Sequence, residues 1–145
     1  MNPKVSIIIL NWNGLDDTVH CLESLEKIIY SNYDVIVVDN GSEGNDAQIL
    51  REKFKDYIHV IENDKNYGFA EGNNIGIRYA LKDSAPDYIL LLNSDTEAKN
   101  YFVKGNVEFM NADSSVRILS WVIVDERGRN WFPGGALNRG WHRTW

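Results

Sequence analysis

The stretch VSIIIL, residues 5–10, is a continuous apolar run rich in β-branched side chains. β-Branched residues favour strands, and an uninterrupted apolar run is typical of a strand that is covered on both faces. The run ends at Leu10, and the polar residues Asn11 and Asn13 flank Trp12 directly after it. This pattern predicts an inner strand of a sheet, followed at its carboxyl end by a polar loop.

Three more apolar runs repeat the pattern downstream: DVIVVD (34–39), IHVIE (58–62) and YILLL (88–92). Helices are predicted between these runs and after the last one. The apolar residues at helical spacing are Leu15, Val19, Leu22, Leu25 and Ile29 for the first helix, Ala47, Leu50 and Phe54 for the second, and Phe102, Val103, Val107 and Met110 for the fourth. The third helix is predicted within the segment 66–82. A further strand is predicted at 116–124. Strands that alternate with helices predict an α/β fold, with a mostly parallel sheet flanked by helices on both faces.

In such sheets, ligands bind beyond the carboxyl ends of the strands. The four predicted ends are 10–13, 39–42, 63–66 and 93–96, and each is rich in small polar residues. Asp39 is suited to accept hydrogen bonds from ribose hydroxyls or from the imide N–H of a pyrimidine. Asp95 is suited to hold a divalent cation whose coordination is completed by phosphates and water. Taken alone, an ordinary turn is the better explanation of either residue.

The glycines of NYGFAEGNNIGI (66–77) recur every four residues, at 68, 72 and 76. This spacing differs from the dinucleotide fingerprint G-x-G-x-x-G, which disfavours a classical NAD domain. The glycines suit either close approach of the backbone to a ligand or close packing of a helix. Asn73 or Asn74 could cap that helix or bind a base.

Length and composition limit the number of domains, the possible partners and the cellular compartment. A chain of 145 residues suits one domain, and a formal net charge of −6 argues against a nucleic-acid partner. Cys21 is the single cysteine, which fits a reducing compartment, and its apolar helical setting predicts a buried structural thiol. No apolar run approaches the length of a membrane span, so a cytoplasmic protein is expected.

Together, several motifs resemble the GT-A glycosyltransferases of family 2, and most closely the rhamnosyltransferase-like members. The motifs are VSIIILNWNG (5–14), CLESL (21–25), DVIVVDNGS (34–42), NYGFAEGNNIGI (66–77), YILLLNSDT (88–96) and, more weakly, the glycine pair 134–135. Each is weak alone, but their order and spacing over residues 3–112 are specific. The resemblance implies a donor-binding half at 1–112 and the start of an acceptor half at 113–145.

The resemblance also implies a set of site residues. Those expected to bind the nucleotide sugar are Leu10, Asn11, Asn13, Asp39, Asn40, Asn66, Gly68, Gly72, Asn73, Asn93, Ser94 and Asp95. Asn93-Ser94-Asp95 occupies the family's D-x-D position, so Asp95 is the expected ligand of Mg²⁺ or Mn²⁺. Because Asn93 replaces the first aspartate, metal affinity is expected to be weak and to depend on bound nucleotide.

The expected reaction transfers a sugar, with inversion, from a UDP- or dTDP-sugar to a hydroxyl of a polysaccharide or glycolipid. The family's general base lies in a Glu-Asp-like motif that this chain lacks, so a truncated chain with little or no transfer activity is expected. Peripheral association with the inner face of the membrane is implied for the full-length protein. Two alternatives stay open: a sugar-phosphate nucleotidyltransferase, and a nucleotide-binding module without catalytic activity.

Overall fold

A computed structural model describes residues 2–125, 127–132, 134–138 and 141–144. The chain divides into two compact units, residues 1–100 and 101–145, and each is described by itself. The expectation of one domain divided after residue 112 stays a prediction.

The first unit is built on a four-stranded sheet. Its strands are β1 (Val5–Asn11), β2 (Tyr33–Asp39), β3 (His59–Glu62) and β4 (Tyr88–Asn93), in the order β3-β2-β1-β4. Every neighbouring pair is parallel. The two apolar runs at the centre of the sheet are the most deeply buried, as their continuous hydrophobicity predicts.

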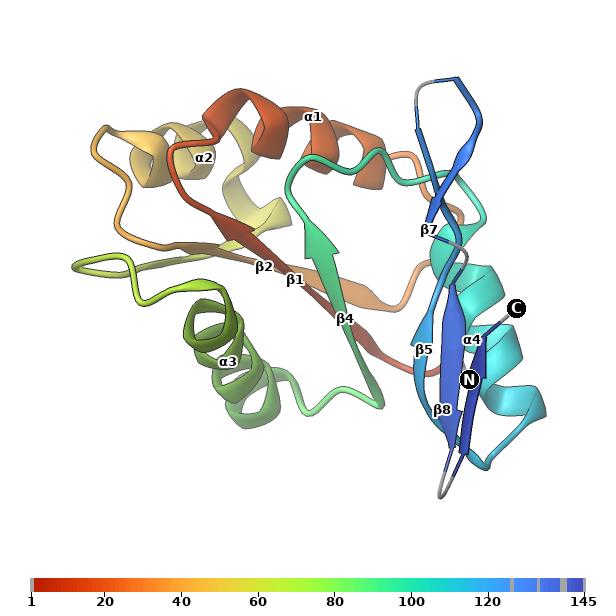
Figure 1. Ribbon diagram of the computed structural model, residues 1–145. Coiled ribbons are helices and arrows are strands. Elements are labelled where there is room, and N and C mark those ends of the chain that lie inside the picture. The colour runs from red at the N-terminus through yellow and green to blue at the C-terminus, as the bar shows by residue number, and fades with distance from the viewer. Residues whose placement is uncertain (1, 126, 133, 139–140, 145) are drawn as a thin grey trace. The chain divides into compact units, whose positions relative to one another are not determined.

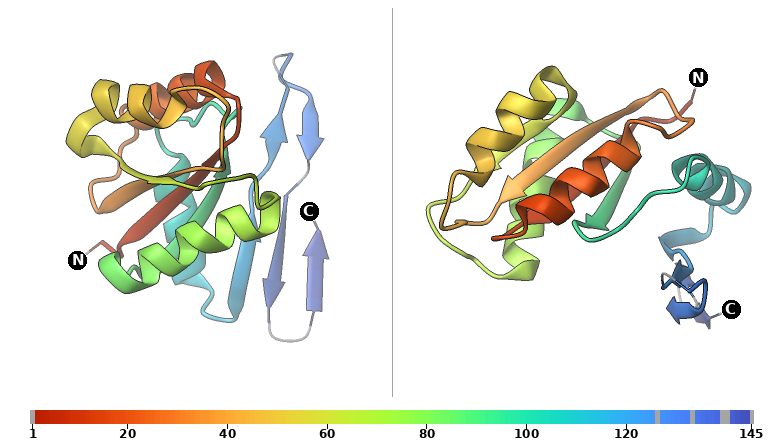
Figure 2. Two further views of the ribbon diagram at one scale, coloured as in Figure 1. Left: turned by 90° about the vertical axis from the view of Figure 1, so that its left-hand side faces the viewer. Right: turned by 90° about the horizontal axis from the view of Figure 1, so that it is seen from above.

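Helices cover both faces of this sheet (Figures 1 and 2). Helices α1 (Leu15–Leu25) and α2 (Asp46–Phe54) lie on one face, and α3 (Phe69–Tyr79) packs on β1 and β2 from the other. A 3₁₀ turn, η1 (Lys55–Tyr57), follows α2, and a π-helical turn, η2 (Ala80–Ser84), follows α3. The predicted α/β class, with a parallel sheet between helices, is confirmed.

The core beneath α3 is a cluster of Ile8, Ile36, Val38 and Ala80. Helix α3 reaches these strands closely because it carries glycine where a side chain would collide. A Cβ on Gly76 would lie 2.6 Å from Cγ2 of Ile8 and 3.1 Å from Cγ2 of Val38. The four-residue glycine spacing therefore serves helix packing at this position.

The first helix is shorter than its apolar spacing predicts. It ends at Leu25, and Ile29 lies outside it with 51% of its surface exposed. After Leu25 the backbone tightens, since the N–H groups of Lys27 and Ile28 donate to carbonyls three residues back. The N–H of Ile29 donates instead to the carbonyl of Asn100, so it is no longer available to the helix.

The second unit holds α4 (Phe102–Ala112) and five short strands: β5 (Val116–Ser120), β6 (Ile123–Val124), β7 (Asn130–Phe132), β8 (Gly135–Asn138) and β9 (Trp141–Thr144). The single strand predicted at 116–124 is wrong. Its two ends pair antiparallel with different partners, β5 with β8 and β6 with β7. An apolar run does not reveal such a division, because periodicity reports burial and not the partner strand.

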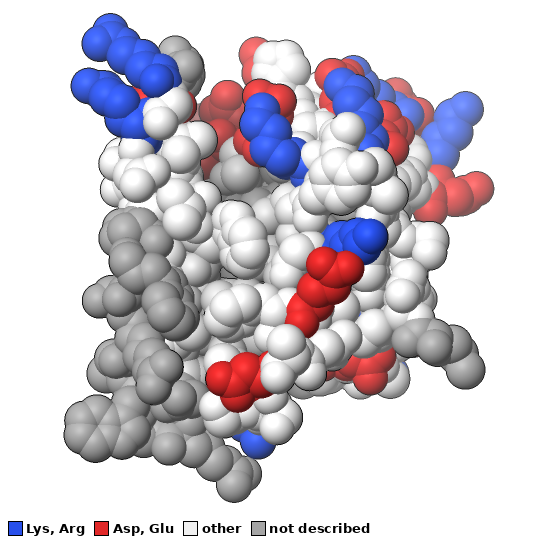
Figure 3. Space-filling model, turned by 90° about the vertical axis from the view of Figure 1, so that its right-hand side faces the viewer, with Lys and Arg blue, Asp and Glu red and all other residues white. Residues whose placement is uncertain are grey.

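Two surface properties of the described residues bear on partners. None of their helices has the length and apolarity needed to cross a membrane. On the face shown in Figure 3, basic side chains are interspersed with acidic and uncharged ones. That face carries no broad basic surface among the described residues, of the kind that a phosphate backbone would need.

Candidate functional site

The carboxyl ends of the four parallel strands form one row across the sheet. Asp39 pairs with Glu62 on one side and with Asn11 on the other, and Leu10 pairs with Asn93. Neighbouring strands are about 4.8 Å apart, so the ends of β2 and β4 are separated by about 10 Å. The predicted site residues on different strands therefore lie along one edge, at a spacing that a nucleoside diphosphate can bridge.

Asp39 is held rigidly at the end of β2. Its side chain is only 4% exposed, and Oδ1 accepts hydrogen bonds from Nδ2 of Asn11 at 2.7 Å and from Oγ of Ser42 at 2.5 Å. Oδ2 has one long contact, 3.4 Å from the backbone N of Ser42. One carboxylate oxygen is thus saturated, and the other retains capacity to accept a hydrogen bond.

The loop after β1 is tied to the loop after β2. Asn13 has a left-handed backbone, with φ of 52°, which asparagine tolerates better than most residues. Its N–H donates to Oγ of Ser42 at 2.9 Å, and its Oδ1 accepts from the N–H of Glu43 at 2.8 Å. Between Asn11 and Asn13, the side chain of Trp12 is 55% exposed beside this network.

Asn40 fastens the loop that leads into α3. Its Oδ1 accepts from Nδ2 of Asn63 and from the N–H of Tyr67, while its Nδ2 donates to Oδ1 of Asn66 and to the carbonyl of Gly68. The side chain is 1% exposed. Asn40 and Asn66 therefore use their amides to shape the loop, and their contact with a nucleotide stays a prediction.

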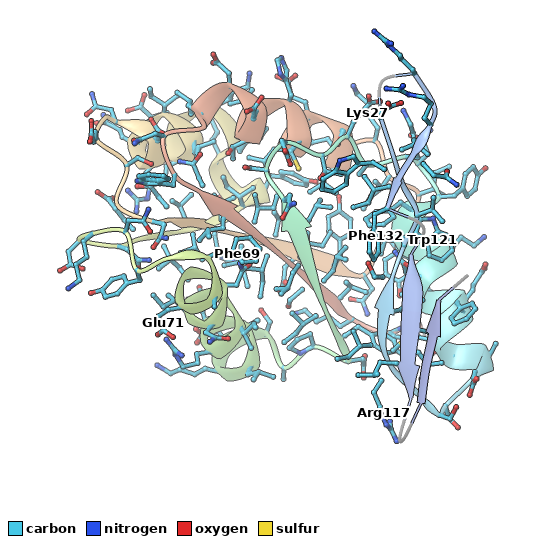
Figure 4. All side chains as sticks on the ribbon, in the orientation of Figure 1. Lys27, Phe69, Glu71, Arg117, Trp121 and Phe132 are labelled. Carbon is cyan, nitrogen blue, oxygen red and sulfur yellow. The ribbon has the colours of Figure 1, made fainter. Side chains whose placement is uncertain are left out.

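The predicted residues on α3 also have structural partners. Gly68 precedes the helix with φ of 83°, and a Cβ on Gly72 would lie 2.5 Å from Cδ1 of Leu10. Asn73 does not cap the helix: it lies inside α3, is 5% exposed, and donates to the carbonyl of Phe69. Phe69 is 66% exposed at the amino-terminal end of α3, where Figure 4 labels it.

At the end of β4, Asn93 and Asp95 are exposed and Ser94 is half-buried. The N–H of Thr96 donates to the carbonyl of Asn93 and closes a turn. Among the described residues, none forms a hydrogen bond or an ion pair with the Asp95 carboxylate. The described chain also holds no cluster of three or more metal-ligating side chains. A single free carboxylate fits a cation that is held mainly by a diphosphate and water.

Cys21 lies beneath this turn. Its Sγ donates to the carbonyl of Asn93 at 3.7 Å. Burial raises the pKa of the Cys21 thiol to about 12, and the negative charge of Asp95 adds to the increase. The side chain is buried and the thiol stays protonated, in agreement with a structural role.

A solvent-open cavity of about 550 Å³ lies at the amino-terminal ends of α1 and α2. Its lining residues are Asn13, Gly14, Leu15, Asp16, Asp17 and Asp46. Three carboxylates would repel a diphosphate, and neither Asp39 nor Asp95 lines the cavity. We therefore place the candidate nucleotide site along the row of strand ends and not in this cavity.

Three hydrogen-bond partners of the Asn11 side chain were not among the site residues predicted from the sequence. Thr18 donates to Oδ1 of Asn11, while Ser42 and Asp46 both contact Nδ2 of Asn11. Ser42 could have been found from its place in the turn after β2. Thr18 and Asp46 lie in helices and give no signal in the sequence.

The fold is shared with solved glycosyltransferases. The mannosyltransferase PcManGT from Pyrobaculum calidifontis, solved with GDP-Man and Mn²⁺, superposes with a TM-score of 0.75 at 19% identity. The match covers 88% of this chain and 37% of that chain. This likeness confirms the predicted GT-A fold.

Two curated relatives support the same grouping. The low-salt glycan biosynthesis hexosyltransferase Agl10 of Haloferax volcanii is 36% identical over 128 residues, which is 88% of this chain and 39% of the relative. The dTDP-rhamnosyl transferase RfbF of Shigella flexneri is 27% identical over 135 residues, which is 92% of this chain and 43% of the relative. The chain thus spans less than half the length of these relatives.

The sequence model for glycosyl transferase family 2 matches residues 6–144, nearly the whole chain. This match agrees with the motif order, the parallel sheet and the row of polar strand ends. The chain belongs to glycosyl transferase family 2.

Proposed function

We propose that the chain is the donor-binding part of an inverting glycosyltransferase. The donor is a UDP- or dTDP-sugar, and the acceptor is a hydroxyl of a polysaccharide or glycolipid. The enzyme acts in the cytoplasm, at the inner face of the membrane. The observation that carries the proposal is the row of strand ends, in which Asp39 is firmly held at the end of β2 and Asp95 follows the end of β4, two strands away.

In this proposal Asp39 recognises the nucleoside. An ionised carboxylate accepts hydrogen bonds and donates none, so it matches the N–H of a pyrimidine imide or the hydroxyls of ribose. Its Oδ2 is the oxygen with remaining capacity. The indole of Trp12, exposed beside it, offers an aromatic surface on which the base can stack.

Asp95 serves the other end of the donor. Mg²⁺ or Mn²⁺ bound there would neutralise charge that develops on the diphosphate leaving group. Since Asp95 is one carboxylate without a neighbouring acidic ligand, the diphosphate supplies much of the coordination. The exposed amide of Asn93 would donate to or accept from the nucleotide sugar, and it adds no negative charge.

The test measures binding of UDP and dTDP by calorimetry, in EDTA and in MnCl₂. Wild type is expected to bind more tightly with Mn²⁺. The D39N variant is expected to lose about tenfold or more in affinity under both conditions, because a charged acceptor is removed. The D95N variant is expected to keep metal-free binding and to lose the gain from Mn²⁺.

Asp56 provides a matched control, because it is an exposed carboxylate in η1, beyond the other end of α2. The D56N variant should bind as wild type does in both conditions. Unchanged metal dependence in D95N would contradict the assignment of Asp95. Equal affinities of D39N and wild type would contradict the assignment of Asp39.

A further inference from the structure

Asn11 is a fully buried amide that lies between two carboxylates. Its side chain is 0% exposed, and Nδ2 lies 2.7 Å from Oδ1 of Asp39 and 3.0 Å from Oδ2 of Asp46. Its Oδ1 accepts from Oγ of Thr18 at 2.8 Å. The three partners come from β2, α2 and α1. One side chain therefore joins three elements directly under the candidate nucleoside site.

The orientation of this amide follows from its partners. The carboxylate oxygens of Asp39 and Asp46 accept hydrogen bonds, so the NH₂ group faces them. Oγ of Ser42 lies at a longer 3.2 Å from Nδ2 and itself donates to Oδ1 of Asp39. The two amide hydrogens are thus used by the two carboxylates, and the carbonyl is left for the Thr18 hydroxyl.

This arrangement keeps the side chain of Asn11 out of reach of a ligand. Both of its hydrogens are engaged, its carbonyl is engaged, and the side chain does not reach solvent. Its effect on Asp39 is specific, however. With Oδ1 fixed by Asn11 and Ser42, rotation of the carboxylate is restricted and Oδ2 is held in one direction.

We propose that Asn11 is a positioning residue for nucleoside recognition, which aims Oδ2 of Asp39 at an N–H or O–H of the nucleoside without touching it. The inference rests on the proposed function. It changes the role expected for Asn11 from contact with the nucleotide to support of the residue that makes the contact. It also predicts that Asn11 affects the nucleoside end of the donor and leaves the metal end unaffected.

The experiment compares two variants of the full chain. N11L has a side chain of similar size and removes both donors, so only Ser42 still holds the Asp39 carboxylate. T18V is nearly isosteric and removes the hydroxyl that binds the Asn11 carbonyl, but it leaves the contact from Asn11 to Asp39 intact. Both leave buried polar atoms without a partner, so both should lower the melting temperature.

Affinity for UDP with MnCl₂ is measured by calorimetry, well below the melting temperature of each variant. N11L is expected to bind UDP about tenfold more weakly than wild type, and T18V within about twofold. The same loss in N11L is expected for uridine, which has no diphosphate, and the gain that Mn²⁺ brings to UDP should be preserved. In N11D, a carboxylate oxygen replaces the NH₂ group that donates to Asp39 and Asp46. N11D should therefore bind UDP no more tightly than N11L does.

A purely structural role predicts a different result. In that case N11L and T18V both melt earlier, and the folded protein binds UDP as wild type does. Equal UDP affinity in N11L and wild type overturns the inference while the proposed function stands. Absence of UDP and dTDP binding in wild type overturns the proposed function, and this inference with it.

Discussion

Replacing Gly41 with alanine should release the loop that Asn40 fastens. Gly41 has φ of +75°, and a Cβ there would lie 2.4 Å from the carbonyl carbon of Lys65 and 2.8 Å from the backbone N of Asn66. These are backbone atoms, so the overlap is relieved only if the loop 63–68 moves. Movement of the loop breaks the hydrogen bonds that it forms with Asn40.

The expected loss in the free energy of unfolding of G41A has two parts. An alanine in the left-handed region costs about 1–2 kcal/mol. Each lost neutral hydrogen bond costs about 1 kcal/mol, and water replaces part of that when the loop opens. We expect G41A to lower the free energy of unfolding by about 3 kcal/mol in urea titrations, and the melting temperature by about 10 °C.

Alanine variants of two other glycines measure the backbone cost separately from the cost of the lost loop contacts. Gly68 has φ of +83°, but a Cβ added there would meet no atom within 4 Å, so G68A should show the backbone cost alone. Gly44 has neither a left-handed φ nor a close contact, since its nearest atom is Oδ1 of Asp46 at 3.5 Å, and G44A should be nearly neutral. If G41A is no more destabilising than G68A, the contact between Gly41 and the loop is not tight and the reasoning fails.

Two more predictions concern packing and the buried thiol. G76A should destabilise by about 1 kcal/mol, because overlap with Ile8 and Val38 outweighs the gain in helix propensity. G105A, in α4, meets only ordinary contact at 3.7 Å from Trp121 and should stabilise by up to about 1 kcal/mol; urea titrations that rank the two the other way would contradict this. With a pKa of about 12, Cys21 should resist iodoacetamide at pH 8 in the native state and react in urea, and rapid native alkylation would show that the thiol is accessible.

The central strands of the sheet could be predicted from the sequence, because a buried strand is marked by the apolar residues within the strand itself. The runs at 5–10 and 34–39 are apolar without interruption, and the structure buries both at the centre of the sheet. Ile29 was wrongly placed in the first helix, because helical spacing continues past the residue where backbone hydrogen bonding stops. The division of 116–124 was missed for a related reason, since pairing partners leave no periodic signal.

For the site, the sequence predicted that the polar strand ends lie along one edge of the sheet, but it did not predict which residues there are buried. That this edge binds a nucleotide stays a prediction. Asp39 and Asp95 were predicted because Asp39 ends one apolar run and Asp95 comes shortly after another, and their contact with a ligand stays a prediction. The run before Asp95 is only partly buried as β4, with Leu91 47% exposed. That Asn11 and Asn40 are buried connectors could not be foreseen, since a strand-end asparagine looks the same whether it faces a ligand or a neighbouring loop. Their roles depend on contacts with residues on other elements, such as Thr18, Asp46 and Asn63.

The strand order β3-β2-β1-β4 has a consequence for how the chain acquires its fold. β1 lies inside the sheet, yet it is the first strand to be synthesised, and Val5 pairs with Tyr33 on one side and with Tyr88 on the other. Until the ribosome has released β4, one edge of VSIIIL has no partner. A long-range pairing of this kind closes slowly and exposes a β-branched edge meanwhile. The strand that ends at the candidate nucleotide site therefore needs protection from aggregation during synthesis.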